Sequence, residues 1–117
     1  MADAAAVRRI AASLPGVRDS SKDTHVALYA AGKLFAWSWP EKHHKGPRVY
    51  RLDVLVLRCA MEAKETILEA DPDKFFTEPH YNGYPAVLLR LDKVDEPELE
   101  AILGSAWRSV ALQAGVS

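Results

Sequence analysis

The feature that most constrains the fold is a run of apolar residues near the middle of the chain. Residues 52–59 read LDVLVLRC, and the centre of this run, residues 54–57, is apolar at every position. Successive side chains of a strand point to opposite faces of a sheet, so this strand would be buried on both sides. We therefore predict a sheet in which residues 52–59 form a central strand.

A hairpin is predicted before this strand. Residues 26–30 and 34–39 both alternate with a period of two, and a glycine-containing turn lies between them. Two such runs around a short turn are typical of two antiparallel strands. The alternation places Phe35, Trp37 and Trp39 on one face, and it leaves open whether that face is core or solvent.

Three segments show the spacing of amphipathic helices. Apolar residues recur at helical intervals in residues 7–14, 60–70 and 95–110. Asp95, followed three residues later by Glu98, is the pattern of a capping box at the start of the last helix. We therefore expect a helix near each end of the chain and one in the middle.

The order of these elements predicts the fold class. Residues 75–77 and 86–91 are expected to form two further strands, which gives the order α-β-β-β-α-β-β-α. Because the helices interrupt groups of strands, we predict an α+β fold of two layers, a largely antiparallel sheet with helices on one face. Residues 1–117 are expected to form a single domain, with a long exposed connection at residues 40–51.

Composition limits the classes of protein. The 117 residues carry a formal net charge of -1. The longest apolar run is far shorter than the roughly 20 residues that cross a bilayer, so no membrane association is expected. Cys59 is the only cysteine, and no secretory signal is evident, which predicts a cytoplasmic protein. No glycine has the spacing of a phosphate-binding loop, so no cofactor is expected.

The distribution of charge suggests a partner. Residues 1–59 contain 10 basic and 5 acidic residues, whereas residues 60–104 contain 4 and 11. Basic side chains beside aromatic rings can neutralise phosphates and stack on exposed bases. We predict one contiguous nucleic-acid-binding surface, made by the following basic and aromatic residues: Lys42, Lys45, Arg48, Arg51, Arg8, Arg9, Trp37 and Trp39.

A second aromatic cluster lies in a single loop. His80, Tyr81 and Tyr84 could line a small pocket in which imidazole and phenol groups donate hydrogen bonds to an anion. In the alternative, the tyrosines seal the edge of the sheet and their hydroxyls reach water or backbone. We favour the structural alternative.

Catalytic and metal sites have weaker support. Cys59 would be a nucleophile only if a histidine such as His25 or His80 approached it, and a buried structural thiol is the favoured interpretation. His43 and His44 are adjacent, and no partner at metal-ligand spacing accompanies them. We therefore expect no metal site and no enzymatic activity.

Several segments resemble the MmcQ/YjbR-like family of small bacterial proteins. They are spread over residues 6 to about 112 and consist of residues 14–17 (LPGV), 32–37 (GKLFAW), 55–58 (LVLR), 75–76 (FF), 79–81 (PHY), 84–89 (YPAVLL) and 95–99 (DEPEL). The resemblance implies a two-layer α+β domain related to the secretion-chaperone-like fold. It also implies DNA binding, the activity with which members are commonly described.

Two functions are therefore carried forward. The first is a DNA-binding protein that contacts the nucleic-acid backbone. The alternative is a protein-interaction or chaperone-like module, which would bind a protein partner or form a homodimer through an exposed apolar surface.

Overall fold

A six-stranded antiparallel sheet forms the centre of the protein. The computed structural model describes residues 2–42 and 48–111, and its strands follow the order β1-β2-β3-β4-β6-β5. The elements are α1 (Ala4–Ala11), β1 (Val17–Asp19), β2 (Ala27–Ala30), β3 (Lys33–Lys42), β4 (Arg48–Arg58), α2 (Met61–Ala70), β5 (Phe75–Phe76), the 3-10 turn η1 (Pro79–Tyr81), β6 (Ala86–Arg90), the 3-10 turn η2 (Leu91–Lys93) and α3 (Glu96–Ala111).

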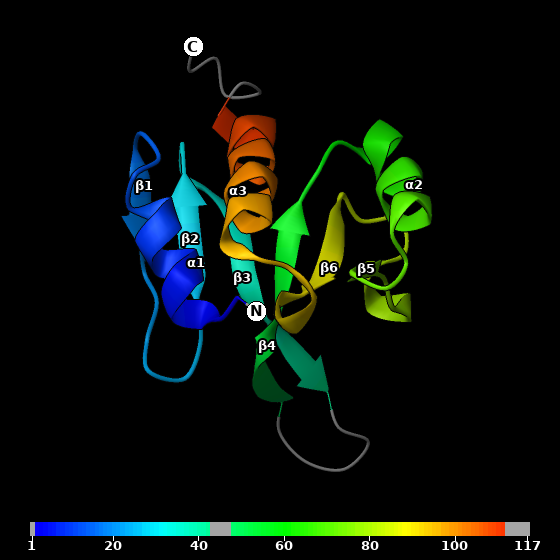
Figure 1. The fold of residues 1–117 in the computed structure, drawn as a ribbon, viewed down its shortest axis with the longest axis horizontal. Coiled ribbons are helices and arrows are strands. Elements are labelled where there is room, and N and C mark those ends of the chain that lie inside the picture. The colour runs from blue at the N-terminus through cyan, green and yellow to red at the C-terminus, as the bar shows by residue number, and fades with distance from the viewer. Residues whose placement is uncertain (1, 43–47, 112–117) are drawn as a thin grey trace.

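The predicted α+β architecture is confirmed. Helices α1 and α3 lie against one face of the sheet, and α2 lies at its β6–β5 side (Figure 1). Strand β4 is central, as its doubly apolar run predicted, with β3 on one side and β6 on the other. The capping box is also present, because Asp95 Oδ1 accepts from the Glu98 backbone N–H at 2.9 Å.

Two expectations about the connections are wrong. An additional strand, β1, lies between α1 and β2, where no strand was predicted, and it pairs with β2. Most of the expected loop at residues 40–51 is also strand, because β3 continues to Lys42 and β4 starts at Arg48. Charged residues in these segments interrupt the apolar alternation from which a strand is predicted. A two-stranded ribbon that projects from a sheet does not require that alternation, because neither of its faces has to be buried.

The two faces of the sheet contribute to different apolar clusters. On one face, Leu55 and Leu57 of β4 pack beneath α1 and α3 in the main core. On the other face, Val54 and Val56 belong to a second cluster that includes Leu88. We call this second side the helix-free face. Within residues 2–42 and 48–111, no helix is long and apolar enough to span a bilayer.

A bulge in β3 changes which side chains share a face. Leu34 lies opposite Tyr29, and Ala36 lies opposite Leu28, so Phe35 is an additional residue in β3. Such a bulge interrupts the alternation of side chains. Phe35 and Ala36 are both buried in the main core, whereas Trp37 lies on the helix-free face. The prediction that Phe35 and Trp37 share a face is therefore wrong.

Candidate nucleic-acid interface

The helix-free face brings together the two aromatic groups that the sequence placed apart. Trp37 and Trp39 are half-buried there, and both pack against the same cluster as Tyr81. The ring centroids of Trp37 and Tyr81 are 6.5 Å apart, and Trp39 meets Phe76 edge-on at 5.8 Å. One aromatic surface therefore runs from β3 to the loop that contains η1.

The η1 loop continues this aromatic surface towards solvent. His80 and Tyr84 each meet Tyr81 edge-on, at 5.1 and 5.9 Å between ring centroids. Tyr81 is buried, whereas His80 and Tyr84 are exposed. His80 and Tyr84 thus pack on the ring of Tyr81, which belongs to the cluster on the helix-free face.

A buried lysine on α2 anchors the η1 loop through its backbone. Lys64 of α2 is only 7% exposed, and its Nζ donates to the carbonyl oxygens of Tyr81 at 2.5 Å and Tyr84 at 2.7 Å. Desolvation by burial lowers the pKa of Lys64, and the nearby Cys59 partly opposes this shift. The ammonium group holds both ends of the loop against α2, which fixes the position of the tyrosine rings.

Three arginines surround the aromatic surface. Arg18, Arg58 and Arg90 follow core residues in β1, β4 and β6, so alternation directs all three to the helix-free face. Each guanidinium lies over an aromatic ring, with distances from Cζ to the ring centroid of 4.8 Å for Arg18 on Tyr29, 5.2 Å for Arg58 on Tyr84 and 4.2 Å for Arg90 on Phe76.

These three arginines differ in their pairing from Arg8, Arg9 and Arg51, which each form an ion pair with a carboxylate. Among the described residues, Arg18, Arg58 and Arg90 form no ion pair with a carboxylate. The backbone contacts of two of them use carbonyl oxygens: Arg58 Nε donates to Leu34 at 3.3 Å, and Arg90 donates to Asp73 at 3.3 Å. Their positive charges are therefore available to an anion.

The arginines of the first helix lie elsewhere. Arg8 pairs with Asp19 at 2.8 Å, and Arg9 pairs with Glu96 of α3. Both residues belong to α1, which covers the face opposite Trp37 and Trp39. The structure therefore does not bring Arg8 and Arg9 together with the aromatic residues (Figure 1).

The basic connection is only partly described. Arg51 lies opposite Trp39 in the ladder and pairs with Glu41 at 3.2 Å and Asp53 at 2.8 Å. The hydrogen bond from Arg51 lowers the pKa of Asp53. Lys45 lies outside the described residues, as do His43 and His44. Lys42 and Arg48 are opposite each other in the β3–β4 ladder, and the structure does not describe their side chains.

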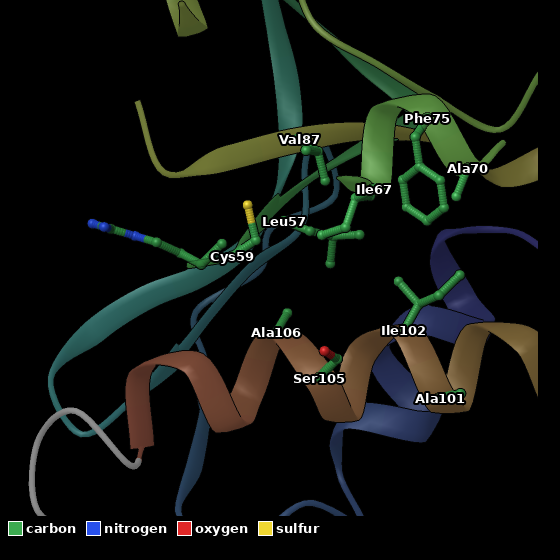
Figure 2. A pocket seen from close by; sticks show the side chains of 11 residues that line it. Leu57, Cys59, Ile67, Ala70, Phe75, Val87, Ala101, Ile102, Ser105 and Ala106 are labelled. Carbon is green, nitrogen blue, oxygen red and sulfur yellow. The ribbon is translucent and has the colours of Figure 1, made fainter. Parts of the chain in front are cut away.

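An apolar groove lies on the other side of the sheet, between α2 and α3 (Figure 2). Its volume is about 290 Å³, and Leu57, Ile67 and Ile102 are among its lining residues. Cys59 also lines it, and burial raises the pKa of this thiol, with a smaller opposing effect from Lys64. A raised pKa disfavours the thiolate that a nucleophile requires.

The arginines of the helix-free face were missed by the sequence reasoning. Arg58 and Arg90 each end an apolar strand, and period-two alternation groups Arg58 with Val54 and Val56. That pattern was a usable signal. The alternation shows which residues share a face of the strand, but it does not show whether helices cover that face.

Fold and site together define a class: small α+β proteins with an antiparallel sheet, helices against one face, and aromatic and arginine side chains on the other. The YjbR family model matches residues 12–109, and the chain belongs to the YjbR family. A crystal structure of Deinococcus radiodurans protein DR2400, with a DUF419 domain, has a similar fold, with a TM-score of 0.65 at 17% identity. The alignment covers 95% of this chain and 86% of that one.

Sequence relatives are found in mycobacteria. Uncharacterized protein Rv2570 of Mycobacterium tuberculosis and uncharacterized protein Mb2600 of Mycobacterium bovis are each 35% identical over 83 residues. The match spans 64% of this chain and 64% of the length of each relative.

Proposed function

We propose that this protein binds DNA as a single strand, through the helix-free face of its sheet. The observation that carries this proposal is the group of three arginines, Arg18, Arg58 and Arg90, that have aromatic neighbours and no carboxylate partner among the described residues. No ion pair with a described carboxylate must break before such an arginine neutralises a phosphate. Arg8 and Arg9, in contrast, would have to exchange an existing partner.

The aromatic side chains favour a single strand over a duplex. Tyr84 is 38% exposed, and Trp37 and Trp39 are half-buried on the helix-free face, where Trp37 packs near Tyr81, the neighbour of Tyr84. Aromatic rings stack on unpaired bases with little regard for sequence, at about 1–3 kcal/mol per base. Bases in a duplex are already stacked on each other and cannot stack on these rings, so a duplex would gain little binding free energy from this face.

The direct test is a titration of labelled single-stranded and duplex DNA at several salt concentrations, followed by fluorescence anisotropy. Each phosphate neutralised on a single strand contributes about 0.7 to the slope of log affinity against log salt, so three arginines predict a slope near -2. Arg18→Gln should weaken binding and reduce this slope by about 0.7. Tyr84→Ala should weaken binding roughly 5- to 150-fold if one base stacks on its ring.

Arg9→Gln is the matched control, because Arg9 is exposed and lies on the helix-covered side. Its affinity and salt slope should equal those of the unmodified protein. Absence of binding to either form of DNA at low salt would refute the proposal. An equal loss in the Arg9 and Arg18 variants would also refute it, since the charge effect would then be general rather than located on the helix-free face.

A further inference from the structure

The apolar groove between α2 and α3 leaves part of the main core uncovered. Ile67 of α2, Phe75 of β5 and Ile102 of α3 line it, and all three are only half-buried although they pack against the core cluster. Their side chains lie around the space between the two helices, together with Leu57 of β4 (Figure 2). Apolar side chains gathered around a recess are typical of a ligand-binding site.

The groove is open because several of the positions that line it carry small side chains. These positions are Ala70 of α2 and Ala101, Ser105 and Ala106 of α3 (Figure 2). Larger side chains there would fill the space, as they do in a close-packed interior. The walls of the groove belong to helices and strands rather than to a long loop, so its shape exists before any ligand arrives.

The size of the groove indicates what kind of molecule it can hold. A protein helix with its side chains is about 10–12 Å across, and a typical protein interface buries roughly 800 Å² on each partner. A recess of about 290 Å³ is too small for either. Ligand pockets start at about this volume, so a small molecule is the occupant that fits.

The polar groups of the groove indicate the charge of this occupant. Among the lining residues only Arg58 is charged, and its guanidinium lies over Tyr84 on the helix-free face while its Nε donates to Leu34. The other polar groups are the thiol of Cys59 and the hydroxyl of Ser105, which makes no side-chain hydrogen bond within the described residues. A charged ligand would lose hydration here without gaining a partner of opposite charge.

We propose that this groove binds a neutral, mostly apolar small molecule of one or two rings, whose hydroxyl or carbonyl group forms a hydrogen bond with Ser105. An apolar cavity of about 150 Å³ holds benzene, so a groove of about twice that volume accommodates two fused rings. A serine hydroxyl can donate or accept, so it can bond to either group. The site is independent of the DNA-binding proposal, because the sheet separates the groove from the helix-free face.

The first test is a titration with naphthol, which has two fused rings and one hydroxyl and is neutral at neutral pH, followed by NMR of the methyl groups. The resonances of Ile67 and Ile102 should shift and saturate. Naphthoate has the same rings and a negative charge, and it should bind at least about tenfold more weakly. Ser105→Ala should weaken naphthol binding roughly 2- to 10-fold, as expected for the loss of one hydrogen bond.

A steric test fills the groove. Ala101 is an exposed residue of α3, so Ala101→Leu adds bulk to the groove without overpacking the core, and leucine is a strong helix former. Naphthol binding should be abolished. Ala5→Leu is the matched control, because it makes the same change at an exposed position of α1, and it should bind naphthol like the unmodified protein. Urea unfolding checks that both variants are folded.

Alkylation of Cys59 tests the site in the unmodified protein. Because Cys59 lines the groove, naphthol at ten times its dissociation constant should slow the reaction with iodoacetamide about tenfold. Absence of naphthol binding would overturn the proposal, as would unchanged binding by Ala101→Leu or unchanged alkylation of Cys59. Naphthoate that binds as tightly as naphthol would also overturn it, as would NMR shifts centred on Trp37, since the probe would then stack on the helix-free face.

Discussion

The Lys64 anchor gives the sharpest test of how the aromatic surface is held. Lys64→Met removes the ammonium group and keeps most of the side-chain volume, so the change isolates the two hydrogen bonds to the carbonyls of Tyr81 and Tyr84. Both carbonyls keep one backbone donor: Tyr84 N–H donates to Tyr81 at 3.0 Å, and Ala86 N–H donates to Tyr84 at 2.8 Å. Neither oxygen is left without a partner.

The expected loss of stability follows from this geometry. Hydrogen bonds to charged groups contribute about 1.5–3 kcal/mol each, and the desolvation of Lys64 offsets part of the sum. We therefore expect Lys64→Met to lower the free energy of unfolding by about 2 kcal/mol. Urea unfolding followed by tryptophan fluorescence measures this difference, and Trp37 reports directly because its ring packs near Tyr81.

The pH dependence provides the control. Because burial lowers the pKa of Lys64 in the folded state, the unfolded chain binds the extra proton between that value and 10.5. The folded protein should therefore gain stability as the pH rises through this alkaline window, and Lys64→Met should lack this gain. If the methionine variant is as stable as the unmodified protein at neutral pH, desolvation outweighs the hydrogen bonds, and the anchor does not stabilise the loop.

Three further predictions concern single side chains. Ser38→Ala should lower the free energy of unfolding by about 1–3 kcal/mol, because the Ser38 hydroxyl accepts from the buried Val26 N–H; unchanged urea unfolding would contradict this. Cys59 should react slowly with iodoacetamide at neutral pH and much faster in urea, since burial raises its pKa; equal rates would show an accessible thiol. The pKa of Asp53 is lowered in the folded protein, so its ionised carboxylate stabilises the fold above about pH 3.8, and this stabilisation is lost as the pH falls further. The free energy of unfolding of Asp53→Asn should therefore decrease slightly less steeply on acidification.

The strongest local patterns predicted the fold correctly. Residues 54–57 of β4 are apolar at every position, and such a strand is stable only when both of its faces are covered. The capping box at Asp95 and Glu98 likewise depends on residues three apart in the chain. Features of this kind can be predicted because the groups that interact are close in sequence or share one strand.

Part of the candidate surface was also predicted. Trp37 and Trp39 were predicted as aromatic members of a nucleic-acid-binding surface, and both lie on the helix-free face. Their contact with the η1 loop could not be predicted, because it joins β3 to a segment more than 40 residues away. The bulge at Phe35 was equally hidden, since one additional residue in a strand has no signature in the alternation that precedes it.

The sequence by itself determined the class of fold, the central strand and the types of side chain available for binding. Only the tertiary structure decided which charges are free. Arg9 is neutralised by Glu96, which lies 87 residues further along the chain, whereas Arg58 meets the ring of Tyr84. An electrostatic pair depends on the distance between its two groups in space, and that distance is set only when the sheet and helices pack together.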